Sequence, residues 1–440
     1  MKSTSQKVSF AEKVGYSLGD GSANLIFQMM MMFQMFFYTD VFGIKATAAG
    51  MILLFARVFD AFVDPVVGIL SDRTNSKWGK YRPWLIWTAI PFAVFFVLAF
   101  TTPDLGERGK IIYAGITYTL LMSIYSFNNT PYSSLGGVMT SDIKERTSIA
   151  SVRFVTATLA TFVVQGLTLP LVTKFGGSPV SSKGWMLTVS LFALIGLIFM
   201  VITFFSARER IVPPANQKTP VKQDLKDILG NKPWKAMFVL TLFLFTTLAL
   251  WGSSMSYYFN YVVDKNALFY FLDKAGLVGI ANTDMGFLKT LLDAFGLIVY
   301  EPEKVFAVGF SLFNMIGQIV TLAGVIFLSQ FLSNIFGKRD VFIVCLALTA
   351  LFTGLFFVVS PSDITGIFVL NILKSLAYAP TIPLLWAMMG DVADHSEWVH
   401  HRRATGFVFA GIVFALKAGL GIGGALCGTI IDKFGFVANE

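Results

Sequence analysis

Long apolar segments recur along almost the whole chain, and short polar stretches separate them. Each segment is long enough to cross a bilayer as a helix, which needs about 20 residues. The segments cover residues 14–42, 44–70, 84–102, 111–138, 149–174, 184–206, 235–262, 305–331, 341–359, 364–390 and 404–431. The pattern predicts an all-α membrane protein with eleven spans.

Composition agrees with this pattern. Of the 440 residues, 55% are hydrophobic and only 14% are charged, whereas a soluble chain carries about 25% charged residues. Because the deficit extends over the whole length, we expect a multi-pass protein rather than a soluble domain with an anchor.

Cys345 and Cys427 lie singly in apolar segments, so neither a disulfide framework nor a thiolate metal site is predicted. The polar residues 1–13 predict no cleavable signal peptide.

The excess of positive charge has a topological explanation. The net charge is +8, which by itself would also fit a nucleic-acid partner. If residue 1 is cytoplasmic, twenty of the 34 lysines and arginines fall in cytoplasmic loops and ten on the opposite side, as the positive-inside rule requires. We therefore expect a protein of the cell (inner or plasma) membrane with a cytoplasmic N-terminus, surrounded by lipid and without a nucleic-acid partner.

The chain divides into two similar parts. Residues 207–234 form the longest predicted cytoplasmic connection and separate a first half, 1–206, from a second half, 235–440. A proline precedes an aspartate by eleven residues at the end of the fourth span of each half, and repeated halves are typical of transporters. Two halves of six would give twelve spans, so we expect the last helix to be truncated or absent.

An insertion at residues 263–304 interrupts the second half on the predicted outer side. Residues 269–272 and 287–300 have the pattern of short amphipathic helices that lie on a surface. The insertion is either a lid over a substrate path or a plain surface loop, and loops tolerate such additions.

A stripe of charge inside the second span carries most of the functional information. Asp60 and Asp64 are four residues apart and share one helix face with Arg57. An ionised group at membrane depth costs about 3 kcal/mol or more unless it is paired, hydrated or bound to a cation. The stripe indicates a cation-coupled transporter. The alternative is a structural network in which the two acids only neutralise Arg57 and Arg153.

Other polar residues lie at comparable depth. Asn129 is as far from the end of the fourth span as Asp60 is from the end of the second, which favours one shared site. Asp20, Arg153 and Lys417 add charges to the first, fifth and eleventh spans. Asn128 and Asn129 could equally bridge helices by hydrogen bonds, and Trp386 is either packing or a sugar-stacking platform. The histidines at 395, 400 and 401 have no usual metal-site spacing.

Several motifs together resemble the glycoside–pentoside–hexuronide:cation symporter family of the major facilitator superfamily. They are Gly15–Asp20, Phe37–Asp40, Ala56–Pro65, Ser71–Trp84, Asn129–Tyr132, Arg153–Phe154, Gly390–Asp394 with Glu397–Trp398, and Lys417–Gly419. The second span and the loop that follows it are the most specific part. The resemblance implies the major facilitator fold and covers nearly the whole chain except the insertion.

The resemblance also implies roles for individual residues. Asp60, Asp64 and Asn129 would bind the coupling cation. Because the melibiose branch of the family has an aspartate where this chain has Asn129, both Na⁺ and H⁺ stay open. Asp20 and Arg153 would hold sugar hydroxyls. The predicted substrate set further contains Asn128, Ser133, Trp386 and Lys417, and the predicted gating loop contains Asp72, Arg73, Lys80 and Arg82. The alternative for that loop is topological positive charge alone.

We therefore predict a secondary active transporter in which a sugar or glycoside moves together with Na⁺ or H⁺ by alternating access. The rival hypotheses are a lysolipid or other amphiphile transporter on the same scaffold and a membrane sugar sensor that does not transport. No nucleophile–base pair, metal motif or phosphate loop is present in the sequence, so we expect neither an enzyme nor a cofactor.

Overall fold

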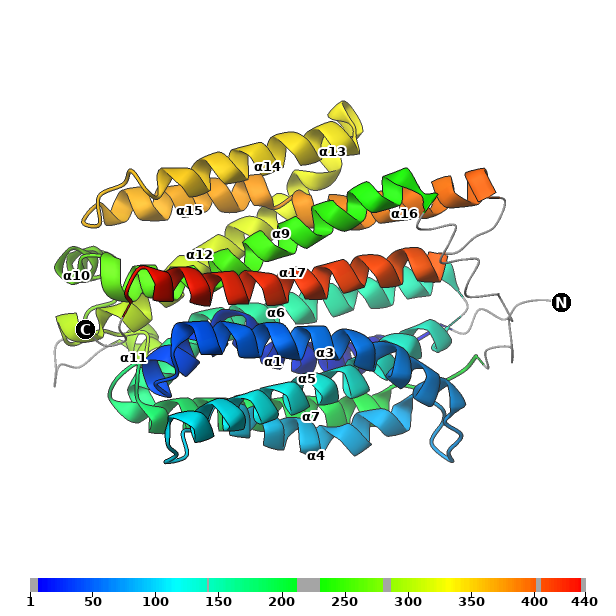
Figure 1. The fold of residues 1–440 in the computed structure, drawn as a ribbon, viewed down its shortest axis with the longest axis horizontal. Coiled ribbons are helices and arrows are strands. Elements are labelled where there is room, and N and C mark those ends of the chain that lie inside the picture. The colour runs from blue at the N-terminus through cyan, green and yellow to red at the C-terminus, as the bar shows by residue number, and fades with distance from the viewer. Residues whose placement is uncertain (1–6, 141, 212–229, 280–285, 401–404, 437–440) are drawn as a thin grey trace.

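The computed structural model describes residues 7–140, 142–211, 230–279, 286–400 and 405–436, and long helices that run roughly parallel make up most of them (Figure 1). The first half contains α1 (Phe10–Met32), α2 (Gln34–Phe36), the π-helix η1 (Phe37–Val41), α3 (Ala46–Arg73), α4 (Arg82–Ala99), α5 (Glu107–Val138), α6 (Ile143–Gly176) and α7 (Ser182–Ser206).

The second half begins with α9 (Lys232–Tyr257) and the π-helix η2 (Tyr258–Val262). The predicted insertion forms α10 (Lys265–Lys274), α11 (Phe287–Ala294) and the 3₁₀-helix η3 (Pro302–Lys304). The remaining helices are α12 (Val305–Phe327), α13 (Ser329–Phe336), α14 (Lys338–Leu355), α15 (Ile364–Tyr378), α16 (Thr381–His400) and α17 (Thr405–Lys433). Most of the predicted connection, residues 212–229, lies outside the described residues.

Local sequence explains where several helices begin. Ser9 accepts a hydrogen bond from the Glu12 backbone N–H at 3.2 Å and so caps α1. Asn231 caps α9, and Asp363 caps α15. Each cap supplies an acceptor for a backbone N–H that the first turn of a helix leaves without an intrahelical partner.

Within the described residues, seven helical segments are long and apolar enough to cross a membrane. They are Arg82–Ala99, Ser148–Gly176, Ser182–Ser206, Lys232–Val262, Pro302–Phe327, Ile364–Val392 and Gly411–Lys433. The helices α1, α3, α5 and α14 are at least as long as the shortest of these, but they carry more polar or charged side chains. The all-helical architecture is therefore confirmed, whereas the count of eleven spans stays a prediction.

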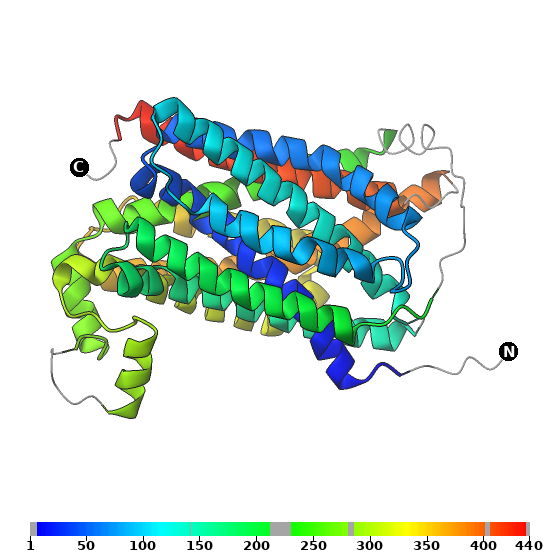
Figure 2. The ribbon, with the colours of Figure 1, turned by 90° about the horizontal axis from the view of Figure 1, so that it is seen from below.

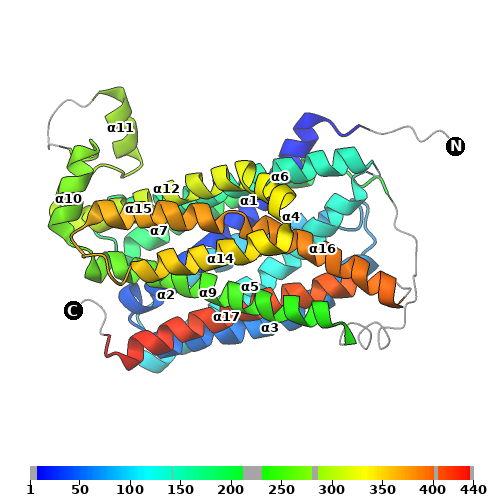
Figure 3. The same ribbon diagram turned by 90° about the horizontal axis from the view of Figure 1, so that it is seen from above.

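The two halves meet along two main seams. In the first half α1 packs on α6 and α7, and α3 packs on α5; in the second half α12 and α14 pack on α15. Across the halves, α17 packs on α3 and α12 packs on α6. Figures 2 and 3 show α17 running beside α3 for most of its length.

Glycines line the seam between α17 and its neighbours α3 and α9. A Cβ atom on Gly428 would lie 2.2 Å from the carbonyl oxygen of Ala46, and one on Gly423 would lie 2.4 Å from that of Thr246. Gly50 on α3 faces the backbone of α17 in the same way. Backbone therefore contacts backbone directly along this seam, as small residues allow in membrane helices.

The halves are joined at the end of the bundle that carries α10 and α11, here called the insertion end. Hydrogen bonds connect η1 to the end of α9 and to η2, which follows it. The hydroxyls of Thr39 and Tyr257 are 2.6 Å apart, and the Tyr261 hydroxyl donates to the Asp40 carboxylate. Lys174 of α6 forms an ion pair with Asp293 of α11. The bundle is thus closed across the two halves at this end.

At the opposite end of the bundle, two ion pairs among the described residues each lie within one half. Lys13 Nζ lies 2.8 Å from Glu145 Oε2 in the first half, and Lys338 Nζ lies 2.8 Å from Asp391 Oδ2 in the second. The hydrogen bond from Lys13 lowers the pKa of the Glu145 carboxyl. These contacts hold each half together without tying it to the other.

Candidate functional site

The carboxylates of Asp60 and Asp64 are brought together with Lys417 of α17. The Lys417 Nζ lies 2.7 Å from Asp60 Oδ2 and also donates to Asp64 Oδ2. The Asp60 side chain is fully buried, and the Ser126 hydroxyl of α5 donates to its second oxygen. We call Asp60 and Asp64 the carboxylate pair. In this conformation a tethered ammonium occupies the position between the two acids that a mobile cation would take.

Arg57 completes the charged stripe but contacts apolar and aromatic side chains of α1. It is buried, its Nη2 donates to Met31 Sδ at 3.6 Å, and its guanidinium lies 5.5 Å from the centre of the Phe27 ring. Within the described residues no ion pair links Arg57 to a carboxylate. The neutralising network expected as the alternative therefore has other members: Lys417 pairs with the carboxylate pair, and Arg153 pairs with Asp20.

Asp20 and Arg153 form a second charged contact, between α1 and α6. Arg153 Nε lies 3.1 Å from Asp20 Oδ2, and both side chains are partly exposed. The guanidinium also lies 4.9 Å from the centre of the Tyr132 ring, which stacks on Tyr16 at 4.7 Å. The rings of Tyr16 and Tyr132 thus pack against the Arg153 guanidinium, and the ion pair stays partly exposed.

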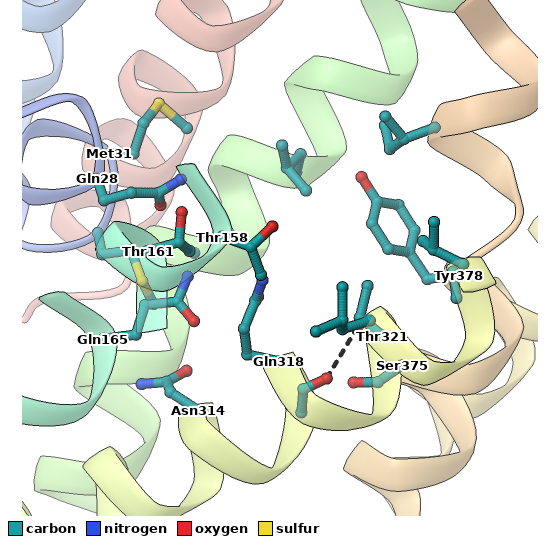
Figure 4. Close-up of a pocket in the computed structure, with 18 of the residues that line it drawn as sticks. Gln28, Met31, Thr158, Thr161, Gln165, Asn314, Gln318, Thr321, Ser375 and Tyr378 are labelled. Carbon is teal, nitrogen blue, oxygen red and sulfur yellow. Dashed lines mark hydrogen bonds between the residues drawn. The ribbon is translucent and has the colours of Figure 1, made fainter. Parts of the chain in front are cut away.

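A cavity of about 490 Å³ lies between the two halves. Its walls come from α1 and α6 of the first half and from α9, α12, α15 and α16 of the second. Figure 4 shows amide and hydroxyl groups projecting into it. The polar lining consists of Asn24, Gln28, Thr158, Thr161, Gln165, Asn314, Gln318, Thr321, Asn371, Lys374, Ser375 and Tyr378. Alternating amides, hydroxyls and aromatic rings are the groups that recognise a polyhydroxylated ligand.

Arg57 lies behind one wall of the cavity. Phe27 and Met31 of α1 line the cavity, and Arg57 of α3 contacts both of them. Asp20 is one helical turn before Asn24, another lining residue, whose side-chain amide donates to the Asp20 carbonyl oxygen. The Asp20–Arg153 contact therefore borders the cavity, and Arg57 connects the cavity wall to the helix that carries Asp60.

The other predicted site residues lie elsewhere. Asn128 is buried and donates to Thr88 Oγ1 at 2.7 Å, Asn129 is half-buried, and Ser133 and Trp386 are exposed. The cavity lining contains none of Asp20, Asp60, Asp64, Asn128, Asn129, Ser133, Arg153, Trp386 and Lys417. Their substrate and cation roles stay predictions.

Sequence reasoning did not assign a role to Ser126 or to the cavity amides Gln28, Gln165 and Gln318, nor to Lys374. Each lies inside a segment that is mostly apolar. A systematic search for polar side chains within apolar segments would have found them, because such residues are rarely placed against lipid.

The predicted gating loop between α3 and α4 folds around a residue that sequence reasoning missed, Glu209, just after α7. Its carboxylate accepts backbone N–H groups of Lys80, Tyr81 and Arg82 at 2.8–3.0 Å, and Arg82 Nη2 donates to the Phe204 carbonyl oxygen at 2.8 Å. Arg73 is exposed, and the Asp72 side chain lies outside the described side chains. An acid at the N-terminus of α4 is favourable for the helix dipole.

Replacement of Glu209 by alanine should loosen this loop. Three backbone donors would lose a charged acceptor, and hydrogen bonds to charged groups contribute about 2 kcal/mol each or less. We expect the melting temperature of the purified protein to fall by several degrees, measured by thermal unfolding in detergent. The exposed neighbour Arg208 is the control, and its replacement by alanine should leave the melting temperature unchanged. Equal melting temperatures for both variants would contradict the capping role.

Comparisons with known proteins agree on one family. A model described as MFS/sugar transport protein matches residues 15–283 and 275–440. The chain is 37% identical to the inner membrane symporter YicJ of Escherichia coli (strain K12) over 99% of this chain and 85% of that one. It is 31% identical to the isoprimeverose transporter of Lactiplantibacillus pentosus over 98% and 82%.

Solved structures support the fold. The nucleoside transporter NupG superposes with a TM-score of 0.63 at 14% identity and covers 97% of this chain and 92% of its own. At that identity the likeness concerns the fold alone. Together with the family model and the full-length relatives, it confirms a multi-pass membrane transporter rather than an enzyme. The chain belongs to the MFS/sugar transport protein family, in its glycoside–pentoside–hexuronide:cation symporter branch of the major facilitator superfamily.

Proposed function

We propose that this protein carries a sugar or glycoside across the cell membrane together with Na⁺ or H⁺. The observation that carries the proposal is the carboxylate pair, in which Asp60 is fully buried and both acids contact the Lys417 ammonium, in a bundle that also encloses a polar cavity. The names of the relatives point the same way, since they include a putative glycoside/cation symporter, YagG of Escherichia coli (strain K12), at 34% identity.

The coupling ion would enter between Asp60 and Asp64. The two carboxylates and Lys417 together carry one net negative charge, so one monovalent cation neutralises the group. Ion binding would then release Lys417 from the pair. Asn129, one turn after Ser126 on α5, would complete the ligands of the ion. No further cofactor is needed for this step.

Coupling between ion and sugar would pass through Arg57, which is one helical turn before Asp60 on α3. Movement of Arg57 changes what supports Phe27 and Met31, and these two side chains line the cavity. Asp20 and Arg153 would hold sugar hydroxyls at the edge of the cavity. By linkage, an ion that strengthens sugar binding must itself be bound more tightly when sugar is present, by the same factor.

Alternating access follows from the two halves. With eleven spans and a cytoplasmic N-terminus, the insertion end faces outward, so the conformation described above is closed to the outside. Outward opening would break the contacts of Thr39 with Tyr257 and of Asp40 with Tyr261 and would separate the halves around the cavity.

Replacement of Tyr261 by phenylalanine should favour the outward-open state. The variant loses a hydrogen bond to a carboxylate, which contributes about 1.5 kcal/mol and shifts a two-state ratio about tenfold. Distances between spin labels on η1 and η2 would measure the shift. Tyr258 on the same helix is the matched control, because its buried hydroxyl has no hydrogen-bond partner among the described residues. If Tyr258→Phe and Tyr261→Phe gave the same distances, the contact would not be a gate.

Transport itself is tested with membrane vesicles. Labelled glycosides are supplied while a Na⁺ gradient and a pH gradient are imposed separately. We expect one of the two gradients to drive accumulation. Uptake that equilibrates but never exceeds the outside concentration under either gradient would refute cation coupling.

A further inference from the structure

Lys374 on α15 is a half-buried cation that the mechanism above does not use. It lines the cavity, and its Nζ lies 4.0 Å from the centre of the Trp251 ring. Within the described part of the chain, no carboxylate or hydrogen-bond acceptor contacts this ammonium. Lys374 is also the one charged side chain among the residues that line the cavity.

An unpaired charge at this position is costly, because a charged side chain at membrane depth is tolerated when it is paired or faces a cavity. The indole of Trp251 compensates part of the cost through a cation–π contact, but it covers one side of an ammonium that has three donors. Of the other cations near the cavity, Lys417 contacts the carboxylate pair and Arg153 contacts Asp20. Arg57 has no ion pair among the described residues, but it lies behind Phe27 and Met31 and does not line the cavity. Lys374 is thus the cation that faces the cavity without a carboxylate partner among the described residues.

The remainder of the cavity suits a sugar. Gln28 and Gln165 project from the first half, and Asn314, Gln318 and Tyr378 project from the second (Figure 4). The Asn314 Nδ2 is buried and has no hydrogen-bond acceptor among the described residues. These groups offer donors and acceptors without charge. A ligand that satisfies the whole lining therefore combines several hydroxyls with one negative charge.

We propose that the substrate is an acidic sugar, a glycoside with one carboxylate of the hexuronide class, and that Lys374 binds this carboxylate. The proposal rests on the proposed sugar transport. A monoanion matches the single positive charge of the lining. A sugar phosphate would be a poorer match, because a doubly charged group calls for further donors such as the planar fork of arginine.

The test uses matched substrate pairs that differ at one carbon. Purified protein in liposomes is assayed by counterflow, an exchange that needs no ion gradient, with glucoside against glucuronide and galactoside against galacturonide, and with a xyloside as the neutral pentoside. For the wild type we expect a preference of about tenfold or more for one of the uronides over its neutral counterpart. Lys374→Gln should lose this preference, measured as the ratio of uronide exchange to neutral-sugar exchange in the same preparation, whatever the overall rate of exchange. Lys374→Arg keeps the charge and should retain most of the preference.

The outcomes separate the two proposals. Wild-type protein that exchanges a neutral glycoside but no uronide overturns the role of Lys374 and leaves sugar transport intact. A Lys374→Gln variant that still prefers the uronide overturns it as well. If no glycoside of any kind exchanges, sugar transport fails and the inference fails with it. The wild-type comparison needs no variant, so it decides the question even if Lys374→Gln does not fold.

Discussion

Replacement of Asp60 by asparagine is expected to abolish accumulation of sugar against a gradient and to leave exchange of sugar largely intact. The wild-type group of two carboxylates and Lys417 has one net negative charge, which attracts the coupling ion. In the Asp60→Asn variant the group is already neutral, because Lys417 keeps Asp64 as its partner. The group then has no net negative charge that would attract the coupling ion. The cavity residues that would bind sugar are unchanged.

The measurement compares two assays on the same vesicles. Gradient-driven uptake should stop where the sugar concentrations inside and outside are equal, which is a complete loss of accumulation. Counterflow should persist. Asp64→Asn should behave alike, since it removes the same charge. Asp340→Asn, at an exposed acid on α14, is the control and should accumulate sugar normally. Full accumulation by both Asp60→Asn and Asp64→Asn would show that the carboxylate pair is not the ion site.

Replacement of Lys417 by methionine should have the second large effect. The variant keeps an unbranched side chain, one atom shorter than that of lysine, but leaves fully buried Asp60 without its cation. Removal of one partner of a buried ion pair costs about 3–5 kcal/mol, because the remaining charge is uncompensated. We therefore expect a strong decrease in melting temperature. We also expect the coupling ion to stabilise the variant more than the wild type, since the ammonium of Lys417 no longer occupies the space between the two carboxylates.

Thermal unfolding of the purified variant, with Na⁺ replaced by choline and with pH varied separately, would measure both effects. Lys338 provides the matched control. It pairs with Asp391 in similar geometry, but both side chains are about half exposed, so Lys338→Met should cost about 1 kcal/mol or less. A Lys417→Met variant that melts like Lys338→Met and does not respond to Na⁺ or to pH would contradict the proposed ion site.

The sequence allowed the charged stripe to be predicted, because helical periodicity places Asp60 and Asp64 on one face whatever the tertiary fold. It did not allow the partner to be predicted. Lys417 is separated from Asp64 by 353 positions, and only the packing of α17 on α3 brings them together. The depth argument predicted that Asn129 of α5 lies at the level of Asp60. The α5 side chain that contacts Asp60 is Ser126, three residues before Asn129, since small differences in helix rotation decide which residue points inward.

The cavity was harder to predict for a related reason. Its amides lie within largely apolar segments of four different helices, and a single sequence does not reveal which faces converge. The short helices α10 and α11 could be predicted from their amphipathic pattern, but the predicted second helix ran to Tyr300, whereas α11 ends at Ala294. Glycines at 296 and 276 have positive φ angles of 73° and 74° and end these helices.

The glycine-lined seam along α17 has a consequence for how the halves move. Interlocked side chains would have to change rotamers, one layer at a time, before two helices could pass each other. Where Gly428 and Gly423 place bare backbone against α3 and α9, no such interlocking exists. We expect this interface to respond to substrate by a smooth sliding displacement of a few ångströms rather than by a hinge, with larger separations confined to the α6 side of the bundle.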